Sequence, residues 1–120
     1  MWGHISSETR RFANTCRWSW QGWTAAWETE KSLRQWTLVN VASVALAMSL
    51  DLTAAERAII VALGVLILAA ELFNTALEEV VDVAMPNPNP GAKKAKDCGS
   101  AGVALTAIAA GIAWGVILVF

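Results

Sequence analysis

The chain has 120 residues, which fits one domain, and 56% of them are hydrophobic while only 16% are charged. Soluble domains carry about 45–50% apolar residues, and a soluble chain of this size could not bury the excess, so the composition excludes an ordinary soluble domain and indicates a membrane protein. The net charge of −1, without a long basic stripe, argues against a nucleic-acid partner.

The first predicted helix covers about residues 6–30 and is rich in tryptophan. Trp20, Trp23 and Trp27 recur at helical spacing, and Arg10, Arg11 and Arg17 precede the tryptophans of this segment. Amphipathic aromatic rings with basic neighbours are typical of a helix that lies in the headgroup plane of a membrane. We therefore expect an interfacial helix whose tryptophans anchor the chain and can also help to shape a lipid site.

Three apolar segments follow, and we predict them to be membrane-spanning helices over residues 32–50, 54–85 and 94–120. At a rise of about 1.5 Å per residue, about 20 residues cross a hydrocarbon core of ~30 Å. The uncharged part of the second segment is too short to span, so its helix has to continue into the acidic stretch that follows. Thr53, with Glu56 three residues on, predicts a capping box at its start. The expected fold class is all-α.

The distribution of charge predicts the orientation of these helices. Basic residues cluster before the first span and after the proline loop, residues 86–92, where three prolines argue against helix. The loop between the first two spans carries a single arginine. The positive-inside rule then places the N-terminus and the proline loop in the cytoplasm and the C-terminus outside.

The acidic end of the second span carries the candidate chemistry. At about 100° per residue, Glu71, Asn74, Glu78 and Asp82 fall on one helix face, whereas Glu79 points elsewhere. Glu71 lies deeper, beside apolar residues, and is a candidate general base. Glu78, nearer the wet end, can hold a hard cation such as Mg²⁺. Intramembrane ionisable residues are functional by default, although helix capping or contact with a partner helix would also explain them.

Two charged residues after the proline loop are candidates for contact with a phosphate. Lys96 can neutralise phosphate charge, and Asp97 can orient a phosphate or an attached nucleoside at the level of Glu78. A lysine cluster beside a span is also the ordinary topogenic signal. The chain has no P-loop motif and no glycine-rich kinase loop, so any nucleotide has to be bound by other means.

Several motifs together resemble a known family. "ELFNTALEEVVD" and "AKDCGSAG", preceded by "WSWQGWTAAWETEKSLRQW", are similar to the small bacterial integral-membrane diacylglycerol kinases, a family that includes undecaprenol kinases. The resemblance implies homotrimers of three-span protomers with an amphipathic N-terminal helix in the bacterial inner membrane. Gly111 and Gly115 offer a small-residue patch consistent with such packing. The implied activity is transfer of the γ-phosphate of Mg-ATP to a lipid hydroxyl at the cytoplasmic interface.

The resemblance also implies roles for individual residues. Glu71 corresponds to the catalytic base and Asn74 to the asparagine beside it. Glu78 and Glu30 correspond to the carboxylates that bind Mg²⁺. The charge pattern by itself does not identify Glu30 as a candidate. The implied ATP-binding positions are Arg11, Trp18, Glu30, Glu78, Asn87, Asn89, Lys96 and Asp97. The implied lipid-binding positions are Arg11, Ser19, Trp20, Ala26, Trp27, Arg34, Gln35, Glu71, Ser100 and Trp114.

The sequence does not determine which nucleotide is preferred or which lipid is phosphorylated. Members of the family often carry Glu-Tyr-His-like residues where this chain has Asn87 and Asn89, so the nucleoside contacts differ here. Diacylglycerol and undecaprenol both present a primary hydroxyl, and likeness in "KDCGSAG" and "RQW" favours diacylglycerol. Two alternatives from other classes are a small ion or proton conduit and an assembly subunit. Neither explains a deep Glu71 together with the Lys96–Asp97 pair.

Overall fold

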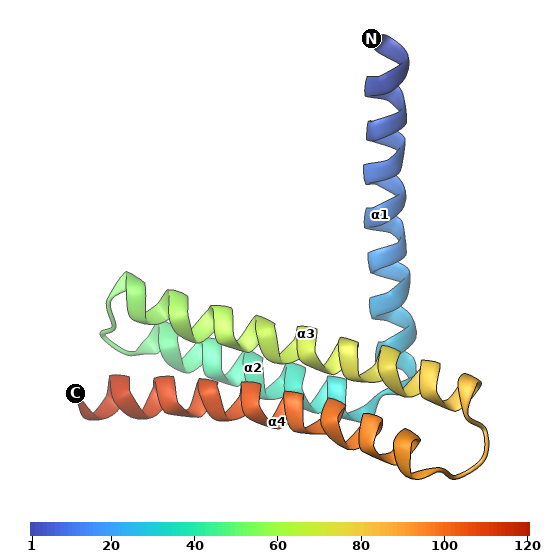
Figure 1. Ribbon diagram of the computed structural model, residues 1–120. Coiled ribbons are helices and arrows are strands. Elements are labelled where there is room, and N and C mark those ends of the chain that lie inside the picture. The colour runs from blue at the N-terminus through green and yellow to red at the C-terminus, as the bar shows by residue number, and fades with distance from the viewer.

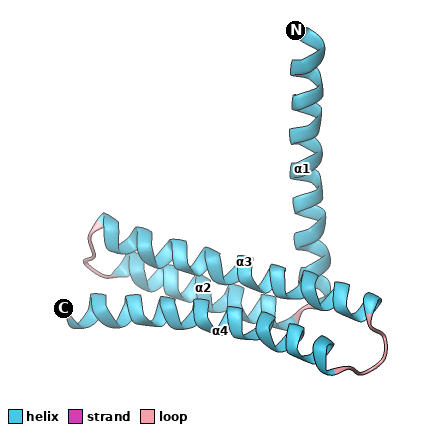
Figure 2. Ribbon diagram, in the orientation of Figure 1, coloured by secondary structure: helices cyan, strands magenta, loops and turns pink.

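The computed structural model describes residues 1–120, except for the side chain of residue 2, and the regular structure of these residues is helical. Figure 2 shows the four helices joined by short loops. They are α1 (Trp2–Thr29), α2 (Lys31–Ser49), α3 (Ala54–Ala84) and α4 (Pro90–Val119). The predicted all-α class is confirmed. The first helix begins at residue 2 of the chain, earlier than the expected residue 6.

The molecule is flat and L-shaped, with extents of 51, 48 and 23 Å. Figure 1 shows α2, α3 and α4 lying side by side, while α1 leaves them near the α3–α4 loop and carries the N-terminus far away. The central helix is α3, which contacts both α2 and α4. Trp114 of α4 also reaches α2, where its Nε1 donates a hydrogen bond of 2.8 Å to Ser43 Oγ.

The corner between α1 and α2 is formed at Glu30, whose extended backbone (φ −101°, ψ 105°) interrupts the helix. Arg34, one turn into α2, donates hydrogen bonds from its guanidinium to the backbone carbonyls of Trp27 and Glu28. Carbonyls at the end of a helix lack partners within that helix, so the arginine satisfies two of them and fixes the direction in which α1 leaves.

The loop between α2 and α3 is held by two sets of hydrogen bonds. The predicted capping box is confirmed, because the Glu56 amide donates to Thr53 Oγ1 at 3.2 Å and the Thr53 amide donates to Glu56 Oε2 at 2.7 Å. Arg57 donates from Nε to the Ala47 carbonyl at 3.1 Å and from its terminal nitrogen to the Leu50 carbonyl at 2.8 Å. The end of α2 is thereby attached to the start of α3.

The loop between α3 and α4 is shorter than predicted, because α4 begins at Pro90 rather than at residue 94. The Asn89 side-chain oxygen accepts hydrogen bonds from the amides of Gly91 (2.8 Å) and Ala92 (3.1 Å). Proline is favoured in the first helical position, since the amide hydrogen that it lacks has no helical partner there. The expectation that all three prolines exclude helix is therefore wrong for Pro90.

Two of the helices, α3 and α4, are long and apolar enough to cross a membrane. Their outward side chains are largely apolar and exposed, as at Phe73 (76%) and Ile112 (61%). Exposed apolar surface on this scale requires lipid or another protein chain to cover it. The more polar α2 is not among them, so the predicted span over residues 32–50 stays a prediction.

An asparagine lies over a glycine at both helix interfaces. Asn40 of α2 covers Gly64 of α3, and Asn74 of α3 covers Gly99 of α4, so closely that a Cβ at either glycine would overlap the asparagine Oδ1. Small residues allow backbones to approach closely in membrane bundles, where hydrogen bonding by polar side chains adds to packing. These two contacts set the spacing of α3 from its neighbours.

We predict that Gly64→Ala destabilises the bundle by about 1–3 kcal/mol, the usual cost of overpacking. The added methyl would force the Asn40 amide away and break its 3.0 Å hydrogen bond to the Trp36 carbonyl. Thermal unfolding of purified protein in detergent should show a lower midpoint for Gly64→Ala. Gly102→Ala, where a Cβ meets no atom within 4 Å, is the control and should not lower it.

Candidate active site

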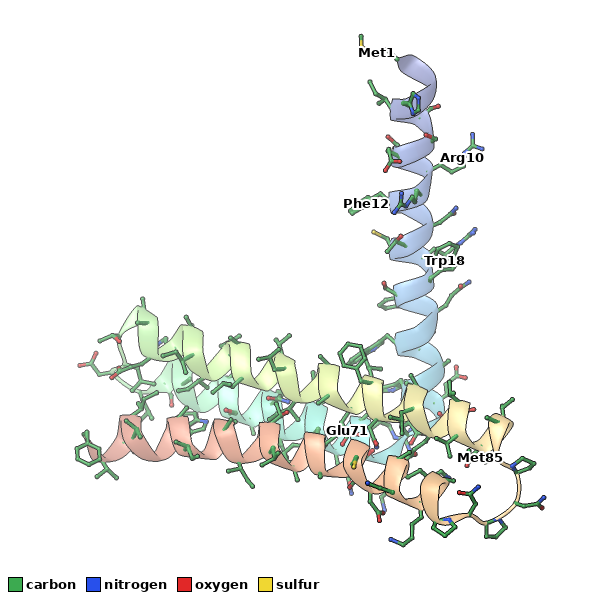
Figure 3. All side chains as sticks on the ribbon, in the orientation of Figure 1. Met1, Arg10, Phe12, Trp18, Glu71 and Met85 are labelled. Atoms are coloured by element: carbon green, nitrogen blue, oxygen red, sulfur yellow. The ribbon has the colours of Figure 1, made fainter. Side chains whose placement is uncertain are left out.

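Among the residues whose side chains are described, Glu71 is the one charged residue that is buried, with 5% of its surface exposed. It lies on α3 at the level of the first turn of α2, where Ser32 Oγ donates a hydrogen bond of 3.0 Å to Glu71 Oε2. Figure 3 shows Glu71 between the helices rather than on an outer face. A carboxylate held dry beside a single hydroxyl is suited to accept a proton from a substrate.

Sequence reasoning did not find Ser32. A serine near the start of an apolar segment has no distinctive spacing, and its role appears only when α2 packs against α3. The available signal was its position two residues after Glu30, the carboxylate at the corner.

Asn74 and Glu78 follow on the same face of α3. Asn74 Nδ2 donates a hydrogen bond of 3.3 Å to Glu78 Oε1, and both residues are half-buried. Among the described side chains, none donates to the buried Oδ1 of Asn74, which faces Gly99. Buried acceptors are usually satisfied, so this oxygen is an exception in the α3–α4 interface.

Lys96 of α4 completes this face by forming an ion pair with Asp82 of α3. The side chain of Lys96 is 39% exposed and that of Asp82 is 63% exposed, so the pair lies at the wet end of the helices. Asp97 instead pairs with Lys93 on the exposed side of α4. Of these two predicted nucleotide ligands, Lys96 therefore contacts α3, whereas Asp97 contacts a residue of its own helix.

Exposure rises in steps along the predicted acidic face. Glu71 is buried, Glu78 is half-buried and Asp82 is exposed. Glu79, predicted to point elsewhere, is also exposed. The face therefore runs from the buried Glu71 carboxylate to the exposed Lys96–Asp82 ion pair. A ligand that enters from the α3–α4 loop meets this ion pair before it meets Glu71.

An open cleft of about 670 Å³ lies at the wet end, between the last turn of α3, the loop and the first turns of α4. Asp82, Lys96, Asn87 and Asn89 line it. The side-chain oxygen of Asn89 is engaged in capping α4, which leaves its amide nitrogen for a ligand. The cleft has room for part of a nucleotide beside the lysine.

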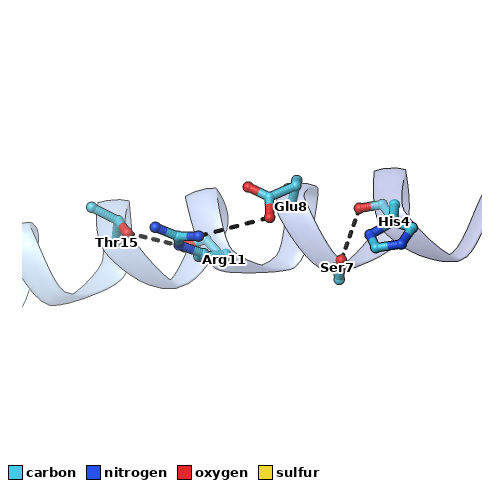
Figure 4. A network of polar contacts seen from close by, with 5 residues as sticks. All are labelled: His4, Ser7, Glu8, Arg11 and Thr15. Atoms are coloured by element: carbon cyan, nitrogen blue, oxygen red, sulfur yellow. Dashed lines mark hydrogen bonds and ion pairs between the residues drawn. The ribbon is translucent and has the colours of Figure 1, made fainter.

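The predicted site residues at the far end of α1 are not brought to Glu71 within one chain. Arg11 pairs with Glu8 at 3.7 Å on an exposed surface, and Trp18 is 59% exposed. Figure 4 shows that the polar contacts around Arg11 are made to residues of α1 itself. In Figure 3, Trp18 lies along the projecting part of α1, well away from Glu71.

The remaining predicted residues lie in several places. Near the corner, Ala26 is buried and Trp27 stacks on Trp23 with ring centroids 5.9 Å apart, while Arg34 binds backbone carbonyls. Ser19, Trp20, Gln35 and Ser100 are exposed, whereas Trp114 is half-buried.

Glu30, a predicted metal ligand, is half-buried at the corner and accepts a hydrogen bond of 3.1 Å from Thr29 Oγ1. Among the described side chains, no three of histidine, cysteine, aspartate and glutamate gather as a metal site.

Fold and candidate site together define a small all-helical protein with two helices apolar enough to cross a membrane and with carboxylates and a lysine at one end of its bundle. A family model described as prokaryotic diacylglycerol kinase matches residues 17–118. A diacylglycerol kinase of Pseudomonas aeruginosa is 40% identical over 111 residues, 91% of this chain and 89% of the relative. That of Escherichia coli K12 is 33% identical over 108 residues, 90% and 88% of the two chains, and that of Synechocystis is 39% identical over 103 residues, 85% and 59%.

The chain therefore belongs to the prokaryotic diacylglycerol kinase family. The predictions of this family and of a lipid kinase are confirmed. A kinase of this family uses ATP as its co-substrate.

We predict that Gly99→Ala lowers kcat by about tenfold, the effect of losing a hydrogen bond to a charged group. A methyl group at this position would displace the Asn74 amide and separate it from Glu78. Turnover is measured with saturating lipid and Mg-ATP, and Gly102→Ala serves as the matched control one turn away on α4. Equal activity of the two variants would contradict the prediction.

Proposed function

We propose that the protein transfers the γ-phosphate of Mg-ATP to the hydroxyl of diacylglycerol, giving phosphatidic acid, with Glu71 as the general base. The observation that supports this most is the buried Glu71 carboxylate on the same helix face as Glu78 and the Lys96–Asp82 pair. A lipid hydroxyl at the interface and a triphosphate from the water side can approach this face from opposite directions.

The length of α3 supports this arrangement. A hydrocarbon core of ~30 Å takes about 20 helical residues, and counted from Ala58 that stretch ends near Leu77. Glu71 then lies within the apolar zone, whereas Glu78 and Asp82 lie at or beyond its boundary. The helix continues to Ala84, so the acidic end extends into the headgroup region.

Mg²⁺ would be held by Glu78 and Glu30. Glu78 has one oxygen engaged by Asn74, which leaves Oε2 for a cation, and Glu30 lies at the α1–α2 corner. Mg²⁺ binds through one or two carboxylates together with waters and substrate phosphates, so this donor set fits it without a larger cluster. When bound, the ion neutralises charge that develops on the transferring phosphoryl group.

The nucleotide would occupy the cleft at the loop end. Lys96 contacts the phosphates, Asp97 lies on the next position of α4, and Asn87 and the amide nitrogen of Asn89 face the nucleoside. With asparagines there, contacts to the base are neutral hydrogen bonds. In the step itself, Glu71 takes the proton of the lipid hydroxyl while the hydroxyl oxygen forms a bond to the γ-phosphorus. The bond from that phosphorus to the bridging β,γ-oxygen breaks, and ADP leaves. Asn74 helps to orient the lipid hydroxyl.

The working unit is a homotrimer whose sites are shared between protomers. Arg11 and Trp18 are proposed ATP ligands, yet they belong to α1, which projects away from the bundle that holds Glu71 of the same chain. The exposed apolar sides of α3 and α4 provide surface for neighbouring protomers and for lipid. An α1 helix lying in the interface could then reach the bundle of a neighbour.

The protein lies in the bacterial inner membrane as a three-span protein with a cytoplasmic N-terminus. The clustering of basic residues near α1 and the α3–α4 loop supports this orientation. It places the cleft and the acidic end of α3 on the side where ATP is present.

We expect Glu71→Gln to reduce phosphatidic acid formation by at least about 100-fold, because general-base catalysis contributes about that much or more. Purified protein in mixed micelles is given Mg²⁺, labelled ATP and diacylglycerol, and the labelled lipid is counted. ATP binding should be nearly unchanged in the variant. Turnover near the wild-type rate would refute the role of Glu71. Undecaprenol is tested in parallel as the lipid substrate. A higher kcat/KM for undecaprenol than for diacylglycerol would identify undecaprenol as the preferred substrate.

Mixed oligomers test whether sites are shared. Protomers carrying Arg11→Ala are co-assembled with protomers carrying Glu71→Gln, each inactive or weakly active as a homo-oligomer. If α1 of one protomer completes the site of its neighbour, some mixed sites contain both wild-type residues and activity returns on mixing. No recovery in verified hetero-oligomers would show that each site is built within one protomer.

A further inference from the structure

We propose that Ser32 is a positioning residue that orients the Glu71 carboxylate for the phosphoryl transfer. This inference rests on the proposed function of Glu71 and deepens it. The hydroxyl of Ser32 donates to Glu71 Oε2 at 3.0 Å, across the interface between α2 and α3. Among the described side chains, no other hydrogen bond reaches this carboxylate.

The need for a positioning group follows from the geometry of glutamate. The terminal torsion of a glutamate side chain has a broad distribution, so its rotamer does not fix the plane of the carboxylate. A hydrogen bond to one oxygen fixes that plane. With Oε2 bound by Ser32, Oε1 is left to accept the proton of the lipid hydroxyl in one defined direction.

The position of Ser32 is itself closely determined. It lies in the first turn of α2, just after the corner at Glu30, and the corner is secured by Arg34 binding the last carbonyls of α1. The next residue, Leu33, is 1% exposed and fixes this turn within the bundle. Ser32 is half-buried, so water competes little for its hydroxyl.

Ser32 also connects two parts of the proposed site. Glu30, a proposed ligand of Mg²⁺, is two residues away along the chain, and Glu71 is 39 residues away. A change in the α1–α2 corner would move Ser32 and thereby turn the carboxylate. The Ser32 hydroxyl therefore holds the Glu71 carboxylate in a fixed position relative to the segment that carries Glu30.

The test compares Ser32→Ala and Ser32→Thr with the wild type. Ser32→Ala should lower kcat for diacylglycerol by about tenfold with an unchanged KM for Mg-ATP, because the interaction lost is one hydrogen bond to a charged group. Ser32→Thr keeps a hydroxyl and should restore most of the rate. Ser49→Ala, which removes a hydroxyl at the opposite end of the same helix, is the matched control and should behave as the wild type.

A double variant shows whether Ser32 acts through Glu71. In a Glu71→Asp background the shorter carboxylate cannot keep the contact, so adding Ser32→Ala should cause little further loss. A full additional tenfold loss would overturn the proposal, as would a Ser32→Ala enzyme with wild-type kcat or a Ser32→Thr enzyme no better than Ser32→Ala. If Glu71→Gln were active, the proposed function would fail instead, so the two failures are distinguishable.

Discussion

The placement of one carboxylate inside an apolar bundle is the constraint on which the rest of the structure depends. A buried glutamate is costly unless it is hydrogen-bonded, and in a membrane protein the cost is borne only where the group has a use. Here the backbone of α3 carries Glu71 into the interface with α2, where Ser32 is its partner. The helices must therefore keep a fixed depth and a fixed rotation relative to one another.

The contacts around this carboxylate serve that requirement. Asparagine over glycine sets the spacing of α3 from α2 and from α4, so a slide or rotation of either neighbour would create an overlap. Arg34 and Arg57, at the two ends of α2, bind helix-terminal carbonyls and fix the α1–α2 corner and the α2–α3 loop. Little of the bundle is sealed by apolar packing alone, so these polar contacts define its geometry while lipid or other protomers cover its outer sides.

One protomer gathers only part of the site that the family pattern implies. The C-terminal part of α3 and the start of α4 bring together Glu71, Asn74, Glu78, Asp82 and Lys96. The helix α1, which carries Arg11 and Trp18, extends away from the bundle. An arm that contacts its own bundle only near the corner is well placed to act on a neighbour. The proposed sharing of sites between protomers would also suit a small enzyme, since a single flat protomer offers little volume in which to exclude water.

The sequence by itself determined the helices and the acidic face, because both depend on local spacing. Apolar runs, the Thr53 capping box and the period of Glu71, Asn74 and Glu78 are properties of neighbouring residues, and the motifs carried the family. Pro90 was misjudged because its first-turn position depends on the cap made by Asn89. Tertiary structure alone decided that Ser32 meets Glu71 and that Lys96 pairs with Asp82. Contacts between helices depend on their depth and rotation, which no local pattern encodes.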